Sequence, residues 1–326
     1  MKVVISIDSF KGSLTSIQAA QAIEKGIKRV EKEAEVVIKP LADGGEGTVD
    51  ALVDGMGGNM EFIKVTGPAG KPVLAKYGII RPTNPDMEEI NTAIMEMSQA
   101  AGITQVIDKE RNPLYTTTYG VGQMIADAIY KGCRRFIMGI GGSATNDGGV
   151  GMLQALGYDF LDKDGNQINH GSIGLKDLVQ IKDDNVISEL KDCEFHIACD
   201  VTNPLCGEEG CSAIFGPQKG ATKQMVQDMD QWLADYAKIA KQSFIKADAN
   251  KPGTGAAGGL GFAFLTFTNA TLKSGVDLIL NETKLEEEIK DADIVITGEG
   301  CLDAQTAMGK APIGVTKLAK KYGNLD

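Results

Sequence analysis

The sequence predicts an α/β fold in which a parallel-sheet domain is interrupted by an inserted segment. Short apolar runs typical of buried strands precede segments with helical spacing at both ends of the chain. The 40 glycines among 326 residues gather in short clusters after such runs, where a chain turns tightly or approaches a ligand closely. Because the two ends resemble each other around a dissimilar middle, we expect a discontinuous domain that carries an insertion.

The first 40 residues form a strand–helix–strand unit in this prediction. Residues 3–7 are an apolar run, residues 17–30 carry apolar side chains at helical spacing, and residues 35–39 form a second strand. Thr15, followed three residues later by Gln18, is a capping-box signal for the start of the helix. A parallel sheet is the usual product of such a unit.

The middle of the chain begins with residues 60–80, where apolar positions flank the turn-rich stretch 66–72, interpreted as a hairpin or a crossing linker. Further elements are predicted from periodicity and breakers. They are helices at 121–129, 152–156 and 222–244, strands at 136–140, 195–198 and 293–297, a glycine-dense crossing at 253–261, and a last helix from Pro312 to Gly323.

Composition excludes several classes of function. A net charge of −11 argues against binding the phosphate backbone of nucleic acids, which requires an excess of Lys and Arg on one face. The opening residues do not have the pattern of a signal peptide, and no apolar run is long enough to span a membrane. We therefore expect a cytoplasmic protein that binds neither nucleic acid nor membrane, with its six cysteines reduced.

Five polar loops follow predicted strands, at residues 8–13, 43–47, 141–149, 200–203 and 298–310. Ligands of open α/β sheets bind beyond the carboxyl ends of the strands. We therefore expect these loops to converge on one pocket.

The loop 141–149 lies between a predicted strand and the start of a helix, so its small residues can offer backbone N–H groups to a phosphate. A tight turn without a ligand is the alternative. Neither a P-loop motif nor a protein-kinase signature is present. The candidate nucleotide-binding residues are Gly141, Gly142, Ser143, Ala144, Thr145 and Asn146.

Charged residues in the first two loops suggest anion and metal binding. Lys11 and Ser13 could hold a carboxylate or phosphate, although a solvated lysine and a helix cap would look the same. Asp43 and Glu46, flanked by glycines, offer oxygen atoms suited to Mg²⁺, and a solvated acidic turn is the alternative.

Asp200 follows an apolar strand, where a carboxylate is costly unless it has a partner or a function. The last loop combines Glu299, Asp303 and Lys310, any one of which could instead serve in capping.

A zinc site is not expected. Cys193, His196 and Cys199 are three residues apart on or beside a strand, so consecutive members point to opposite faces. Cys206 and Cys211 do not supply the usual second pair of ligands, and we expect these cysteines to be buried as small apolar residues. With two histidines in the chain, His196 is expected in the core.

Five stretches of the chain contain these loops: DSFKGSLTS at 8–16, PLADGGEGT at 40–48, GIGGSATNDGG at 139–149, CDVTNPLCG at 199–207 and TGEGCLDAQTAMGKAP at 297–312. Taken together, they resemble the type I glycerate kinase family, which phosphorylates D-glycerate with ATP. Members of the family usually continue past this point with a further strand and helices, whereas this chain stops at Asp326.

The resemblance implies two α/β domains with a cleft between them. One is Rossmann-like, with a parallel sheet built from both chain ends, at residues 1–66 and 265–326, and the other is inserted at 67–264. It also implies a cytosolic enzyme of organic acid breakdown that uses ATP and yields 2-phosphoglycerate in preference to 3-phosphoglycerate.

The roles assigned to single residues follow from their chemistry. Asp200 is the candidate base with Asp303 in reserve, and Lys11 neutralises either the glycerate carboxylate or the migrating phosphoryl group. The candidate substrate-binding residues are Asp8, Ser13, Asn203 and Lys310, and the candidate Mg²⁺ ligands are Asp147, Glu299, Asp43 and Glu46. A kinase of another small hydroxy acid, an inactive ligand-binding relative and a homodimer stay open.

Overall fold

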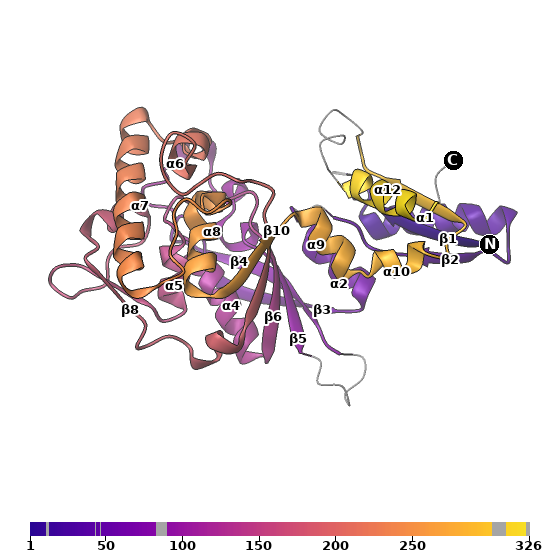
Figure 1. The fold of residues 1–326 in the computed structure, drawn as a ribbon, viewed down its shortest axis with the longest axis horizontal. Helices are drawn as coiled ribbons and strands as arrows, with labels where there is room; N and C mark the ends of the chain where they lie inside the picture. Colours follow the sequence, from indigo (N-terminus) through magenta and orange to yellow (C-terminus); the bar gives the residue numbers. More distant parts are fainter. Residues whose placement is uncertain (11–12, 43, 46, 83–89, 302–310, 324–326) are drawn as a thin grey trace. The chain divides into compact units, whose positions relative to one another are not determined.

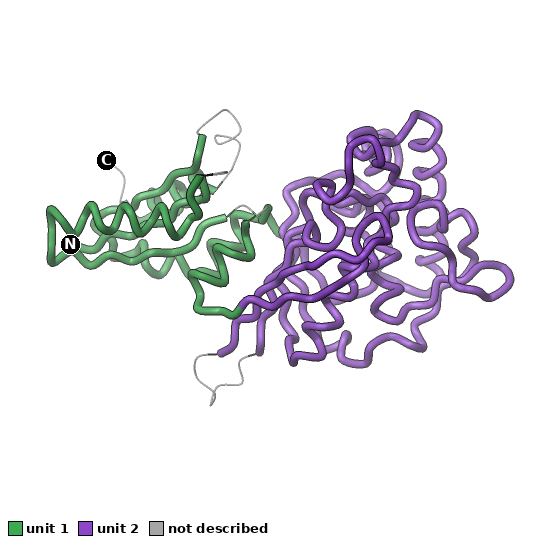
Figure 2. The backbone as a smooth tube through the Cα atoms, turned by 180° about the vertical axis from the view of Figure 1, so that it is seen from behind, with its two compact units in different colours: residues 1–59, 273–326 green, residues 60–272 purple. Residues whose placement is uncertain are grey.

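The computed structural model describes residues 1–326 except 11–12, 43, 46, 83–89, 302–310 and 324–326. The chain divides into two compact units (Figure 2): unit 1 comprises Met1–Asn59 with Lys273–Asp326, and unit 2 comprises Met60–Leu272. The expected exchange points at 66 and 265 differ from these bounds, which leave β3 (Asn59–Thr66) almost entirely in unit 2.

Unit 1 contains a three-stranded parallel sheet in the order β11-β1-β2. Its strands are β1 (Lys2–Ile7), β2 (Glu35–Ile38) and β11 (Ile294–Gly298). The first and last of these strands along the chain therefore pair directly, which confirms a parallel sheet built from both chain ends. Central strand β1 is buried on both faces, as its continuous apolar run predicts.

Helices cover both faces of this sheet (Figure 1). Val3 and Ile5 of β1 pack with α1 (Ser16–Val30), whereas Val4 packs with α12 (Ala311–Lys321), because alternate side chains of a strand point to opposite faces. The predicted capping box is present at the start of α1. The remaining helices described in this unit are α2 (Thr48–Met56), α9 (Gly275–Glu282) and α10 (Leu285–Ile289).

Unit 2 is built on a six-stranded sheet in the order β10-β9-β6-β5-β4-β3. Its further strands are β4 (Pro72–Ile80), β5 (Asn91–Glu96), β6 (Cys133–Gly139), β9 (Glu194–Ala198) and β10 (Asn269–Lys273), and a separate pair is formed by β7 (Asp159–Leu161) and β8 (Gln180–Lys182). β5, β6 and β9 are parallel, and β4 is antiparallel to β5. Because β3 and β4 are neighbours joined by a short turn, the stretch 66–72 connects adjacent strands.

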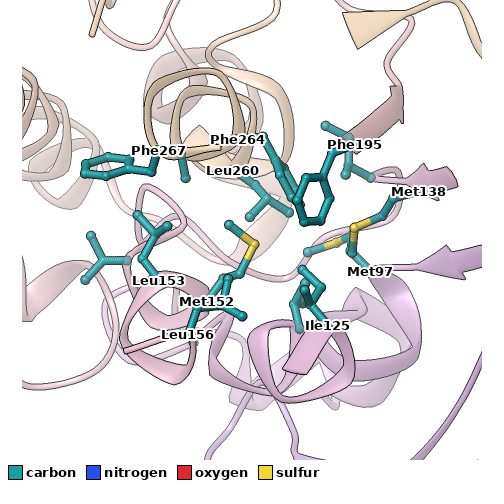
Figure 3. Close-up of a cluster of buried hydrophobic side chains, with 14 of the residues drawn as sticks. Met97, Ile125, Met138, Met152, Leu153, Leu156, Phe195, Leu260, Phe264 and Phe267 are labelled. Carbon is teal, nitrogen blue, oxygen red and sulfur yellow. The ribbon is translucent and has the colours of Figure 1, made fainter. Parts of the chain in front are cut away.

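The α-helices described in unit 2 are α3 (Ser98–Ala101), α4 (Tyr119–Tyr130), α5 (Val150–Ala155), α6 (Cys211–Phe215), α7 (Lys223–Ser243) and α8 (Ala256–Phe267). Figure 3 shows how α4, α5 and α8 contribute to the core, where Ile125, Met152 and Phe264 gather with Phe195 of β9. None of the helices in the described part of the chain has the length and apolar character needed to cross a bilayer. All six cysteines carry free thiols, and His196 is half-buried rather than in the core.

Candidate active site

Two of the predicted loops leave unit 2 at the same edge of its sheet. Gly139 at the end of β6 pairs with Ala198 at the end of β9 in a parallel register. Residues 140–149 and 199–204 therefore start side by side at the carboxyl ends of neighbouring strands, the usual ligand-binding edge of such a sheet. Asp200 is exposed there.

The loop 141–149 contains backbone amides without a backbone partner among the described residues, at exposed Gly141 and Gly142 and at buried Ser143, Thr145 and Asn146. Gly141 and Gly142 are exposed, and Gly142 has a φ of 71°, in the left-handed region that glycine adopts most easily. Within the described residues, no backbone carbonyl accepts a hydrogen bond from the N–H of Gly141, Gly142, Ser143, Thr145 or Asn146. A series of such N–H groups just before a helix is a common binding site for anions.

Neighbouring backbone holds this loop in place. The N–H of Ile103 donates to the carbonyl of Gly142 (2.8 Å), and the N–H of Ala144 donates to the carbonyl of Ala101 (2.9 Å). On another side, the N–H of Gly148 donates to the carbonyl of Gly258 (2.9 Å). The loop therefore keeps its shape through contacts with two other segments of unit 2.

The glycine-dense crossing at 253–261 links this loop to the segment that carries Asp200. A Cβ atom on Gly258 would lie 2.1 Å from the carbonyl oxygen of Thr145, and one on Gly255 would lie 2.2 Å from that of Pro204. The N–H of Gly255 also donates to the carbonyl of Asn203 (2.9 Å). The predicted nucleotide-binding residues, Asp200 and Asn203 are thus brought into one region.

This crossing is visible in the sequence, but no role could be predicted for it there. Ala257, Gly258 and Gly259 adopt three consecutive left-handed conformations, with φ of 53°, 67° and 93°. Ala257 is strained in this conformation, as glycine would not be, and such strain is often found at functional sites. The density of glycine was the available signal, but the sequence does not disclose which loop the crossing contacts.

Asn203 uses its side chain within its own loop, where Nδ2 donates to the carbonyl of Glu209 (2.9 Å). This contact keeps the segment after Asp200 folded, and a substrate-binding role for Asn203 stays a prediction.

Asp147 is better suited to a structural role than to the predicted metal role. Its carboxylate is fully buried and accepts hydrogen bonds from the N–H and hydroxyl of Thr118 (both 2.8 Å) and from the N–H groups of Gly149 (3.2 Å) and Gly151 (3.4 Å). Burial raises the pKa of Asp147, and these hydrogen bonds act in the opposite direction. Because both oxygens are occupied and shielded from solvent, this side chain does not fit a metal that bridges ATP phosphates.

Lys219 lies beneath the loop and was not among the residues predicted from the sequence. It ends a short 3-10 helix, Pro217–Lys219, and is 2% exposed. Its Nζ donates to the Oγ of Ser143 (2.9 Å) and to the carbonyl of Thr145 (2.6 Å). Burial lowers the pKa of Lys219 to about 8, although Cys211 and Asp147 favour the charged form. Lysines are rarely this buried, but no sequence motif places Lys219 next to a loop more than seventy residues earlier.

Unit 1 contains a cavity of about 340 Å³ at the carboxyl ends of its strands. Asp8 and Ser13, both predicted to bind substrate, line it together with Asp50 and Asp54. Glu299 directly follows Gly298, which pairs with Ile7, so Asp8 and Glu299 leave neighbouring strands at the same position. The structure therefore places these two carboxylates at one edge of the sheet.

The predictions for Lys11, Asp43, Glu46, Asp303 and Lys310 lie outside the described residues. Within the described part of the chain, no group of three or more His, Cys, Asp or Glu side chains is arranged to hold a metal ion. The predicted residues thus form one group in each unit, and convergence of all five loops on one pocket stays a prediction.

An α/β protein with unpaired loop amides and carboxylates beyond the ends of parallel strands has the organisation of an enzyme that binds small anionic ligands. Similarity to known proteins identifies it further. The chain belongs to the glycerate kinase family, whose model matches residues 3–325.

Individual relatives align with nearly the whole chain. It is 47% identical to a glycerate kinase from Halalkalibacterium halodurans, over 98% of this chain and 83% of the relative. It is 46% identical to glycerate 2-kinase from Escherichia coli, over 99% and 83% respectively. A solved structure described as putative glycerate kinase 2 from Salmonella typhimurium LT2 matches with a TM-score of 0.92 and 45% identity, over 99% of this chain and 84% of that one.

Proposed function

We propose that this protein transfers the γ-phosphoryl group of ATP to D-glycerate, giving 2-phosphoglycerate in preference to 3-phosphoglycerate. The observation that carries the proposal is the series of N–H groups at Gly141, Gly142, Ser143, Thr145 and Asn146, from which no backbone carbonyl of the described residues accepts a hydrogen bond, in a chain of the glycerate kinase family. Such N–H groups bind phosphate oxygens through short, directed hydrogen bonds.

Asp200 is the proposed base for the glycerate hydroxyl. It is exposed at the same sheet edge as the loop amides, so a hydroxyl and a γ-phosphoryl group could approach each other there. Phosphoryl transfer depends chiefly on position and charge neutralisation, and a carboxylate adds acceptance of the hydroxyl proton.

The unit 1 cavity is the proposed contributor to glycerate binding. Ser13 supplies a hydroxyl to it, and Lys11 is the proposed cation for the carboxylate of glycerate. The cavity is of a size suited to a small ligand, although its described carboxylates would repel an anion unless a cation offsets them.

Mg²⁺ is proposed as the partner of ATP. Kinases usually hold this ion with one or two carboxylates together with the substrate phosphates, so a complete protein cage is not required. Glu299 is half-buried and fits this requirement, whereas Asp147 does not. When bound, Mg²⁺ would neutralise developing charge on the phosphate oxygens.

The test is a coupled assay of ADP release with MgATP and D-glycerate, followed by ³¹P NMR of the product. We expect saturable turnover and the signal of 2-phosphoglycerate. A panel of other hydroxy acids and sugar acids separates the alternatives: a better substrate in the panel would reassign the enzyme. A flat trace with every compound would identify an inactive relative.

We also propose a role in the breakdown of organic acids in the cytoplasm.

A further inference from the structure

Lys219 carries a buried positive charge that the proposed chemistry does not use directly. Its ammonium group has three N–H donors, and two of them bind Ser143 and Thr145. Asp147, the buried carboxylate that favours its charged form, is itself occupied by Thr118, Gly149 and Gly151. The ammonium group therefore acts mainly on the loop.

The contact with Thr145 fixes the orientation of one peptide plane. In a trans peptide, the carbonyl of one residue and the N–H of the next point in opposite directions, and the described chain contains no cis peptide. Because the carbonyl of Thr145 points at Lys219, the N–H of Asn146 points away from it. The hydrogen bond from Ile103 to the carbonyl of Gly142 orients the N–H of Ser143 in the same manner.

Two other polar side-chain atoms of the loop lack a hydrogen-bond partner among the described residues. The hydroxyl of Thr145 and the Oδ1 atom of Asn146 are buried without a hydrogen-bond partner among the described residues. Asn146 is anchored through Nδ2, which donates to the Oγ of Ser212 (2.8 Å). Among the described residues, the bond from Lys219 is the hydrogen bond that restrains the Thr145–Asn146 peptide, against which Gly258 also packs closely.

Resting on the proposed function, we infer that Lys219 is a positioning residue for nucleotide binding: from beneath the loop, its ammonium group holds the peptide that carries the N–H of Asn146, and the side chain of Ser143, in the orientation that serves the phosphates of ATP. It adds positive charge behind this peptide without touching the ligand. A backbone amide that is held in place before the ligand arrives binds more tightly than one that must be ordered on binding.

The experiment compares Lys219→Met, Lys219→Arg and the matched control Lys223→Met, an exposed lysine at the start of α7. Steady-state kinetics gives KM for MgATP and for D-glycerate, and calorimetry gives Kd for ADP. For Lys219→Met we expect KM for MgATP and Kd for ADP to rise about 10- to 100-fold, the range for one lost charge-assisted hydrogen bond, with KM for D-glycerate nearly unchanged. Lys219→Arg should restore part of the affinity, and Lys223→Met should behave as wild type.

Two results would contradict the role of Lys219 in nucleotide binding. A Lys219→Met protein that melts like wild type and keeps its ADP affinity would overturn the inference, as would a rise in KM for D-glycerate alone. Should Lys219→Met fail to fold, Lys219→Arg takes its place. The guanidinium group keeps the charge but cannot reproduce both hydrogen bonds, so Kd for ADP should rise several-fold. A folded arginine variant with the Kd of wild type would then overturn the inference. Failure of the proposed function can be told apart from failure of this inference. In that case wild-type protein would bind ADP without turning over D-glycerate.

Discussion

Among single residues, Asp200 most directly tests the proposed proton transfer. Asp200→Asn keeps the shape of the side chain but removes its basicity, so we expect kcat to fall by about 100-fold or more, in the range for loss of a general base. Because Asp200 is exposed, the melting temperature should change little. Glu208→Gln, an exposed acid in the same loop, is the control. Turnover of Asp200→Asn within a few-fold of wild type would assign the base elsewhere.

Asp147 separates a structural role from a metal role. Asp147→Asn would turn an NH₂ group toward donors that now bind its oxygens, so we expect a loss of roughly 3 kcal/mol or more in the free energy of unfolding. The Mg²⁺ concentration that gives half-maximal activity should not move. Urea denaturation and a Mg²⁺ titration check both points. A stable variant that requires much more Mg²⁺ would restore the metal assignment.

The pKa of Lys219 leads to a prediction about stability and pH. In the folded protein the pKa of the Lys219 ammonium group is lowered to about 8. In the unfolded chain this group has its ordinary pKa of 10.5. Between these values the unfolded state binds more protons, so the contribution of Lys219 to stability rises with pH, by at most about 1.4 kcal/mol per pH unit.

Urea denaturation of wild type and Lys219→Met from pH 7.5 to 9.5, roughly the interval in which the two states differ in bound protons, measures this contribution. We expect the difference in free energy of unfolding to shift in favour of wild type as pH rises. Curves that stay parallel over this range would show that Lys219 does not titrate there.

Between elements, the contact of two glycine loops can be tested by adding a single methyl group. Gly258→Ala would place Cβ against the carbonyl of Thr145 at a φ of 67°, so we expect a loss of about 3 kcal/mol or more together with weaker ADP binding. Gly207→Ala shares the left-handed conformation, with φ of 95°, but its Cβ would meet nothing within 4 Å. That control should lose only about 1–2 kcal/mol, the cost of a Cβ in the left-handed region. Equal losses in the two variants would show that backbone strain, and not the loop contact, is responsible.

For the molecule as a whole, the two units have separate apolar cores. Unit 2 is one continuous segment, residues 60–272, and its core includes side chains from α4, α5, α8 and several strands of its sheet. We therefore expect residues 60–272, expressed alone, to fold and to unfold in one cooperative transition. Near-ultraviolet circular dichroism during heating measures this. Absence of a cooperative transition would mean that the core of unit 2 depends on unit 1.

Much of the fold was predictable because local patterns agree with the tertiary structure. The run at 3–7, the Thr15–Gln18 capping box and the helical spacing of 121–129 each describe a segment that buries one face or both. The sequence patterns do not identify α2, α9 and β5. The boundaries between the two units lie near residues 59 and 273, whereas the sequence predicts 66 and 265. Such short elements owe their stability to the surfaces they pack against, and a single sequence does not specify those surfaces.

The loops that carry the proposed chemistry could be picked out without coordinates, because glycine, hydroxyl and carboxyl groups after apolar strands are visible in the chain itself. What supports those loops emerged only from packing. Folding buried the Asp147 carboxylate among four donors, placed Lys219 under Ser143 and Thr145, and set Gly258 against the same loop. Burial and hydrogen-bond partners belong to segments that meet in space, so a side chain acquires its charge state and its role only when the fold supplies its neighbours.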